Sequence, residues 1–186
     1  MFYKNDKLHI DDILVNKIVK KYGTPTYCYS YNQVKENILK FKNNFKRINP
    51  IICFAVKANN NIKILQEIKK FGLGADVVSK GELMAAIKSK INPKKIVFSG
   101  VGKTYEEIEF AVKKKILLIN SESKSEIEIV SKIAKKLKIK VDIGIRLNPN
   151  VDAKTIKEIS TGKISDKFGL TGQEVVSLIS KYRKSN

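Results

Sequence analysis

The sequence contains little arginine for so basic a protein. Only three of its 37 basic residues are arginine, although its formal net charge is +19. Guanidinium groups are the usual readers of phosphates and base edges. The positive charge is carried instead by lysines spread over predicted helix surfaces, which is typical of a solvated face. We therefore expect no nucleic-acid partner, with a basic nucleic-acid-binding module kept as the alternative.

Histidine and cysteine are also scarce. His9 is the single histidine and precedes the first expected strand, which excludes a histidine-rich metal site and a histidine-based catalytic triad within this chain. Cys28 and Cys53 both lie in apolar, strand-like runs. We expect two reduced, buried thiols that pack in the core, rather than a disulfide or a metal site.

Long apolar runs are absent. No stretch approaches the roughly 20 residues that cross a bilayer, and the N-terminus lacks the basic-then-apolar layout of a signal peptide. A cytoplasmic location is therefore predicted.

Short apolar runs alternate with amphipathic helical patterns along most of the chain. The brevity and β-branched content of the runs favour strands at residues 27–29, 51–56, 75–78, 96–98, 116–119 and 141–147. Regular strand–helix units predict an α/β fold with a parallel sheet. The spacing fits either a closed (β/α)8 barrel or an open doubly wound sheet. A closed barrel typically needs about 250 residues, so a barrel would be incomplete here.

Four helix starts carry the capping-box pattern, in which a hydroxyl residue is followed three positions later by glutamate. The hydroxyl residues are Ser79, Thr104, Ser123 and Thr171. Each follows an expected strand or the loop after it, and each opens an apolar-periodic segment.

Lys57 directly follows an apolar strand, at the end of a parallel sheet where α/β proteins keep their sites. Apolar neighbours would disfavour the ammonium, lower its pKa and free the amine to attack a carbonyl carbon. The alternative is a strand-end lysine whose charge simply reaches water. Position alone favours that alternative, because the chain is rich in lysine.

Three further features suggest chemistry. The S-G-V-G-K-T run at residues 99–104 resembles the end of a phosphate-binding loop, but Val97 stands where the complete motif has glycine. We interpret the run as a tight strand-to-helix turn capped by Thr104. Asp76 and Arg146 are charged residues in otherwise apolar strands, so both are site candidates, with a structural ion pair between strands as the alternative.

Several ordered motifs resemble the fold-type III pyridoxal-phosphate decarboxylases. F-A-V-K-A-N at residues 54–59 resembles the strand end whose lysine binds the cofactor, and G-A-D-V-V-S-K-G-E-L at 74–83 follows in the family's order and spacing. Residues 98–104 match the family's next strand and turn. R-L-N-P-N-V-D-A at 146–153, I-S-T-G at 159–162 and K-F-G at 167–169 resemble the diaminopimelate decarboxylase branch.

The resemblance implies a fold and a site. Residues 29–186 would form about five βα units of a pyridoxal-phosphate-binding (β/α)8 barrel, and residues 1–28 would belong to the family's second, β-rich domain. Lys57 would be the catalytic, cofactor-binding lysine, with Asp76 and Arg146 as further cofactor-binding residues. No metal is implied. Residues 148–169 would act as a lid, in which Ile156 stands where many relatives carry histidine.

The resemblance also implies an activity, the decarboxylation of meso-diaminopimelate to L-lysine by a cytoplasmic homodimer. Other family segments, including a glycine-rich phosphate cradle and an E-P-G-R segment, do not occur in the chain. We therefore expect the chain alone to be inactive. An ornithine- or arginine-type decarboxylase of the same family, and a non-catalytic partner-binding fragment, remain alternatives.

Overall fold

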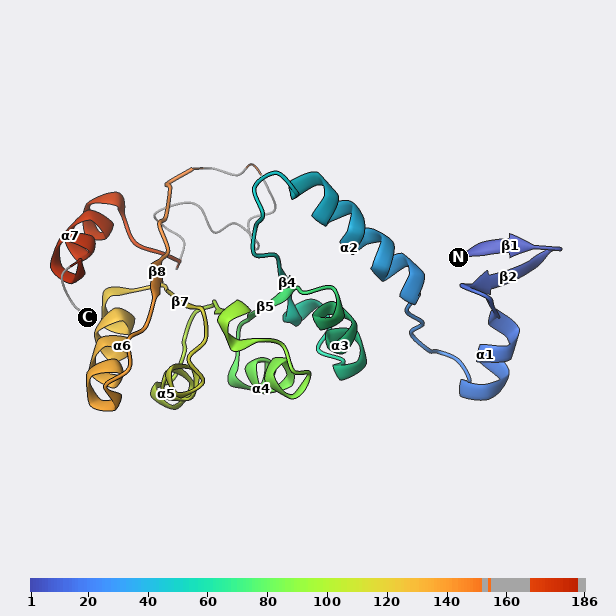
Figure 1. Ribbon diagram of the computed structural model, residues 1–186, viewed down its shortest axis with the longest axis horizontal. Helices are drawn as coiled ribbons and strands as arrows, with labels where there is room; N and C mark the ends of the chain where they lie inside the picture. Colours follow the sequence, from blue (N-terminus) through green and yellow to red (C-terminus); the bar gives the residue numbers. More distant parts are fainter. Residues whose placement is uncertain (152–153, 155–167, 184–186) are drawn as a thin grey trace. The chain divides into compact units, whose positions relative to one another are not determined.

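A computed structural model describes residues 1–151, 154 and 168–183 of the chain (Figure 1). The chain divides into two compact units, Met1–Pro50 and Ile51–Asn186. The expected lid lies mostly outside the described residues, as does Ile156.

The first unit opens with a small antiparallel sheet that the sequence patterns did not reveal. It contains β1 (Phe2–Lys4), β2 (Lys7–Ile10) and β3 (Ile13–Leu14), followed by helices α1 (Val15–Tyr22) and α2 (Tyr31–Phe45). Asn5 and Asp6 form a two-residue hairpin turn with φ of 49° and 57°. Asn and Asp tolerate this left-handed conformation best after glycine, and it suits the twist of a hairpin.

Two expectations for the first unit are wrong. Residues 27–29 form no strand, and Cys28 is therefore exposed rather than buried. His9 does not precede the strands but lies within β2, where its ring stacks on that of Phe2 at 5.6 Å between centroids. The segment around Cys28 belongs to neither of the two sheets that the described residues form.

The second unit confirms the predicted βα repeat. Its strands are β4 (Cys53–Ala55), β5 (Gly74–Val77), β6 (Ile96–Phe98), β7 (Leu118–Ser121) and β8 (Ile143–Ile145). They form one parallel sheet in sequence order. Its helices are α3 (Ile62–Lys70), α4 (Lys80–Lys88), α5 (Tyr105–Lys113), α6 (Lys124–Leu137) and α7 (Gly172–Tyr182), with short 3-10 turns at Val56–Ala58 and Pro93–Lys95.

The two faces of the parallel sheet differ in burial because alternate side chains point to opposite faces. One set is completely buried and packs in an apolar core with the helices; it includes Ala75, Val77, Ile96, Phe98 and Ile119. Figure 1 shows α3 to α6 together on one side of the sheet. The other set is only half-buried and is partly polar; it includes Asp76, Val97, Leu118, Asn120 and Gly144. We call this second set the inner face.

All four predicted helix caps are confirmed, in two forms. Thr104 and Thr171 form complete capping boxes. Ser79 and Ser123 also accept from the third helical N–H, but the glutamate carboxylates reach one residue further back, to the N–H groups of Val78 and Glu122. The carboxylates thereby tie each helix start to the end of the preceding strand.

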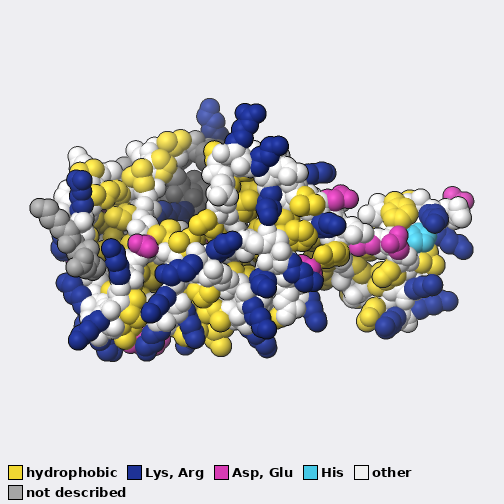
Figure 2. Space-filling model, viewed as in Figure 1, with side chains coloured by type: hydrophobic (Ala, Val, Ile, Leu, Met, Phe, Trp, Pro, Cys, Tyr) yellow, Lys and Arg dark blue, Asp and Glu magenta, His cyan; other side chains and the backbone are white. Residues whose placement is uncertain are grey.

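Basic side chains, lysine or arginine, are spread over the visible surface of both units (Figure 2). Within the described ranges, no helix is both long and apolar enough to cross a membrane. Cys53 is half-buried, and both cysteines are free thiols.

Candidate active site

Lys57 lies where the sequence predicts, in a 3-10 turn just beyond the end of β4. The turn closes through the Asn59 N–H, which donates to the Val56 carbonyl at 3.0 Å, and the Asn59 side chain accepts from the N–H of Asn61. Val56 takes the core position and is completely buried, whereas Lys57 is exposed. The expected apolar surroundings of the amine are therefore not found among the described residues.

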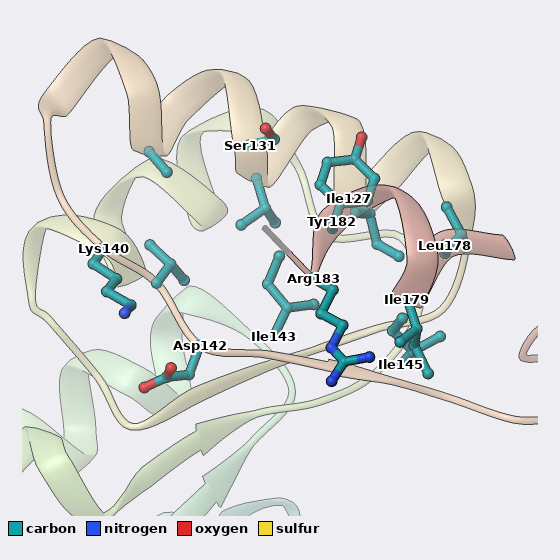
Figure 3. Close-up of a pocket in the computed structure, with 13 residues that line it drawn as sticks. Ile127, Ser131, Lys140, Asp142, Ile143, Ile145, Leu178, Ile179, Tyr182 and Arg183 are labelled. Atoms are coloured by element: carbon teal, nitrogen blue, oxygen red, sulfur yellow. The ribbon is translucent and has the colours of Figure 1, made fainter. Parts of the chain in front are cut away.

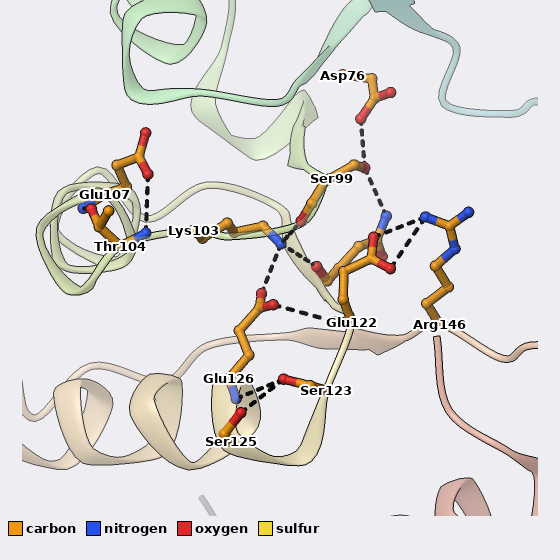
Figure 4. A network of polar contacts seen from close by, with 12 residues as sticks. Asp76, Ser99, Lys103, Thr104, Glu107, Glu122, Ser123, Ser125, Glu126 and Arg146 are labelled. Carbon is orange, nitrogen blue, oxygen red and sulfur yellow. Dashed lines mark hydrogen bonds and ion pairs between the residues drawn. The ribbon is translucent and has the colours of Figure 1, made fainter. Parts of the chain in front are cut away.

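Asp76 lies on the inner face of β5, and Ala55 is its partner on β4. Its carboxylate accepts from the Ser99 hydroxyl at 2.7 Å, and Ser99 accepts from the Asn120 side-chain amide at 3.0 Å. These three residues form a hydrogen-bonded row along β5 and the ends of β6 and β7 (Figure 4). The row fixes one carboxylate oxygen of Asp76.

Gly144 makes room for this row on β8. A Cβ atom there would lie 2.1 Å from the side-chain oxygen of Asn120. Gly144 and Asn120 are register partners in the parallel pair β7–β8. Any side chain larger than hydrogen at 144 would displace the amide from Ser99.

Arg146 follows β8 and forms an ion pair that the sequence patterns did not identify. Its Nη1 donates to both oxygens of the Glu122 carboxylate, at 3.0 and 3.2 Å. Its guanidinium also lies 5.1 Å from the centroid of the Phe168 ring. Arg146 thus forms a structural ion pair, which was the alternative that the sequence allowed for it. Asp76 forms no such pair in these contacts and is held by the Ser99 hydroxyl. Asp76 and Arg146 are not partners of each other in these contacts.

The loop from 148 to 169 is closed at its base by described residues. Leu170 makes two backbone hydrogen bonds to the chain that follows β8. The Asn148 N–H donates to the Leu170 carbonyl, and the Leu170 N–H donates to the Arg146 carbonyl, both at 2.8 Å. The Asn148 side chain donates to the Phe168 carbonyl at 3.0 Å. These contacts hold Phe168 beside Arg146.

The run resembling a phosphate-binding loop is a structural turn, as interpreted. Gly100 and Gly102 have φ of 93° and 71°, and Thr104 caps α5. The Lys103 ammonium is buried and donates to the Gly100 carbonyl at 2.6 Å, the Asn120 carbonyl at 2.7 Å and the Glu126 carboxylate at 2.7 Å. All three of its donors are occupied, so it is not available to a phosphate.

Cys53 faces the inner side of the sheet but is a poor nucleophile. Burial, together with the nearby charge of Asp76, raises the pKa of its thiol. The thiol therefore stays protonated at neutral pH, and only a thiolate reacts as a nucleophile. Among the described residues, no group of three or more potential ligands could hold a metal ion.

A pocket of about 380 Å³ lies away from these groups, between α6, β8 and α7 (Figure 3). Its lining includes Ile127, Ile143, Ile145, Leu178 and Tyr182. None of the three predicted site residues lines it. Besides its apolar side chains, the pocket is lined by Lys140, Asp142 and Arg183, and it lies beside β8.

The structure places the three predicted site residues at the carboxyl ends of their strands, where parallel α/β sheets bind ligands. Lys57 and Asp76 follow or end neighbouring strands, whereas Arg146 lies at the opposite edge, because the strand order runs from β4 to β8. Such a sheet must curve, as in a barrel, for Arg146 to face Lys57. The sequence reasoning missed Ser99, Asn120 and Glu122. A visible signal was that polar residues directly follow β6 and both end and follow β7.

The chain matches the family described as pyridoxal-dependent decarboxylase, pyridoxal binding domain, over residues 31–186. It is 45% identical to a diaminopimelate decarboxylase of Helicobacter pylori strain J99 over 169 residues, which cover 91% of the chain and 42% of that relative. It is 41% identical to a diaminopimelate decarboxylase of Zymomonas mobilis over 181 residues, 96% of the chain and 43% of the relative. The chain thus spans less than half the length of these relatives.

A solved structure gives the same result. The crystal structure of diaminopimelate decarboxylase from Helicobacter pylori complexed with L-lysine superposes with a TM-score of 0.88 at 43% identity, over 92% of this chain and 43% of that one. The five-stranded parallel sheet corresponds to the N-terminal barrel portion of these enzymes. Of the two arrangements that the spacing allowed, the barrel is therefore confirmed. The chain belongs to the pyridoxal-dependent decarboxylase family, whose pyridoxal-binding domain its residues 31–186 match.

Proposed function

We propose that this chain provides the first part of a decarboxylase that uses pyridoxal 5'-phosphate to convert meso-diaminopimelate into L-lysine and CO2. The support is the family membership together with relatives, all named diaminopimelate decarboxylase, at 41–45% identity. One of the similar solved structures is a complex with L-lysine, the product of this reaction. The observation that carries the proposal is an exposed amine, Lys57, at the end of β4 beside a polar inner face.

The residues at the strand ends suit the cofactor. An amine binds the aldehyde carbon, a carboxylate accepts from cationic or N–H groups, and a guanidinium attracts anions. Lys57, Asp76 and Arg146 supply these three groups. The inner face that they border is half-buried and not filled by apolar side chains, so it leaves a polar surface for a ligand.

When bound, pyridoxal phosphate supplies an electron sink for the electron pair left by departing CO2. Lys57 would hold the cofactor until a substrate amine takes its place. Asp76, with one oxygen fixed by Ser99, would present its other oxygen to a positively charged group. Arg146, held by Glu122 and Phe168, would contribute positive charge at the far side of the site.

The isolated chain is expected not to decarboxylate. Among the described residues, β4 pairs only with β5 and β8 only with β7, so both edges of the sheet are unpaired. Unpaired edges invite association with another strand, and an open inner face admits water. We also propose that the complete enzyme is a cytoplasmic homodimer. Residues 1–28 would belong to its second, β-rich domain.

The test fuses the chain to the portion of the Helicobacter pylori relative that lies outside the matched region. CO2 release is then measured with meso-diaminopimelate, L-ornithine and L-arginine, and a Lys57→Ala fusion serves as the control. We expect release from meso-diaminopimelate alone, and none from the control. Faster CO2 release from L-ornithine or L-arginine would instead assign the protein to the ornithine- or arginine-type branch of the family. A folded fusion that is inactive on all three substrates would support the non-catalytic alternative.

A further inference from the structure

A buried lysine links the two predicted cofactor-binding residues that lie far apart in the sheet. Only 1% of the Lys103 side chain and 9% of the Glu126 side chain are exposed. The Lys103 ammonium also lies 5.6 Å from the centroid of the completely buried Phe98 ring. A buried ion pair is weak evidence for stability, because desolvation offsets much of the attraction. The presence of this buried pair therefore points to a role other than stability.

We propose that Lys103 is a positioning residue for both Asp76 and Arg146. This inference deepens the proposed function and rests on it only for the role of those two residues. The ammonium binds the carbonyls of Gly100 and Asn120, so it joins the loop after β6 to the end of β7. Its third bond, to Glu126, joins both to the start of α6.

One arm of the network leads from Lys103 to Asp76. By holding the Asn120 carbonyl, the ammonium fixes the backbone from which the Asn120 side chain reaches Ser99. By holding the Gly100 carbonyl, it fixes the residue after Ser99. Both members of the row that orients Asp76 are thereby anchored at one point (Figure 4).

The other arm leads from Lys103 to Arg146. One oxygen of Glu126 binds Lys103, and the other accepts from the Glu122 N–H at 3.3 Å. Glu122, itself buried, holds the guanidinium of Arg146. A single ammonium thus determines where the carboxylate that faces Arg146 lies.

The test compares three variants of the chain. Lys103→Met removes the ammonium but leaves the Glu126 charge buried, which destabilises the fold by itself. The double variant Lys103→Met with Glu126→Gln removes both charges and keeps an acceptor for the Glu122 N–H. Lys113→Met is the matched control, because Lys113 forms an exposed ion pair with Glu109 at 2.9 Å. Hydrogen exchange is followed by NMR at the Asn120 side-chain amide and the Arg146 guanidinium.

We expect the double variant to regain most of the stability that Lys103→Met loses, with both signals exchanging at least about tenfold faster than in the wild type. The control should match the wild type in both measurements. Wild-type exchange rates in the stable double variant would overturn the proposal. So would a double variant that does not fold, because Lys103 would then act in stability alone.

Cofactor trapping separates this inference from the proposed function. Borohydride treatment of the fusion with pyridoxal phosphate should label Lys57 less in the double variant than in the Lys113→Met control. If the wild-type fusion shows no label at Lys57, the proposed function fails and the exchange result stands. If labelling is equal in all variants while exchange is faster, the network positions Asp76 and Arg146 without serving the cofactor, which would overturn the functional half of the inference.

Discussion

Replacement of Gly144 by alanine should disturb the inner face at a single contact. The added Cβ would lie 2.1 Å from the Asn120 side-chain oxygen, 3.3 Å from its Cγ and 3.5 Å from a methyl of Leu118. Only the first distance is impossible, so the Asn120 amide must rotate. Rotation breaks its hydrogen bond to Ser99 and frees the hydroxyl that orients Asp76.

The expected loss of folding free energy has two parts, the broken hydrogen bond and the rotated side chain. Loss of a hydrogen bond between neutral groups costs about 1 kcal/mol, and a side chain forced off its rotamer costs a similar amount. We therefore expect Gly144→Ala to lower the free energy of unfolding by about 2 kcal/mol. A comparison is available at Gly172, at the start of α7, where a Cβ would meet nothing within 4 Å. Gly172→Ala should stabilise the protein by about 0.5 kcal/mol, because it restricts the unfolded chain.

Urea unfolding followed by far-UV circular dichroism measures both changes. The free energy of unfolding should fall in Gly144→Ala and rise in Gly172→Ala. A Gly144→Ala variant as stable as the wild type would refute the close contact with Asn120. Equal destabilisation by both substitutions would show that loss of glycine itself, and not the contact, is responsible.

Three further predictions concern charged and titrating groups. Lys103→Met should lower the free energy of unfolding by about 3–5 kcal/mol in urea, because it leaves the Glu126 carboxylate buried and unpaired, and a loss below 1 kcal/mol would contradict the burial of the pair. Cys53 should react with iodoacetamide more slowly than the exposed Cys28 at pH 8, since burial raises its pKa, and equal rates in mass spectrometry would contradict this. Glu107→Gln should destabilise the protein at pH 7. Hydrogen bonds from the N–H groups of Thr104 and Lys80 lower the pKa of Glu107 below the ordinary 4.5. The ionised carboxylate therefore stabilises the fold fully above pH 4.5, and this contribution should fade as the pH falls through the lowered pKa. A destabilisation that persists unchanged in strong acid would contradict it.

Much of the second unit could be predicted because its local signals agree with its packing. The apolar runs at 51–56 and 96–98 become β4 and β6, and each predicted hydroxyl cap begins a helix. The strand boundaries were predicted less accurately. A strand was predicted at 116–119, whereas β7 is Leu118–Ser121, because Ile116 packs in the core without pairing in the sheet. The antiparallel sheet of the first unit was missed because its hairpin turn uses Asn5 and Asp6 without glycine, and its strands are short.

The site was predictable only in part. Lys57, Asp76 and Arg146 stand out in the sequence because charges interrupt apolar strands or follow them. Their partners do not stand out, because they come from other strands and become neighbours only through the parallel register. Lys103 was identified as part of a false phosphate-binding pattern, and its burial against Glu126 required the folded structure.

The most direct test of the central claim is the location of the cofactor on the fusion of this chain with the remainder of its Helicobacter pylori relative. The fusion is incubated with pyridoxal phosphate and reduced with borohydride, and the labelled peptides are then identified by mass spectrometry. The account predicts that one lysine, Lys57, carries nearly all of the label. Label spread over the many exposed lysines in proportion to their accessibility, with no excess at Lys57, would contradict it.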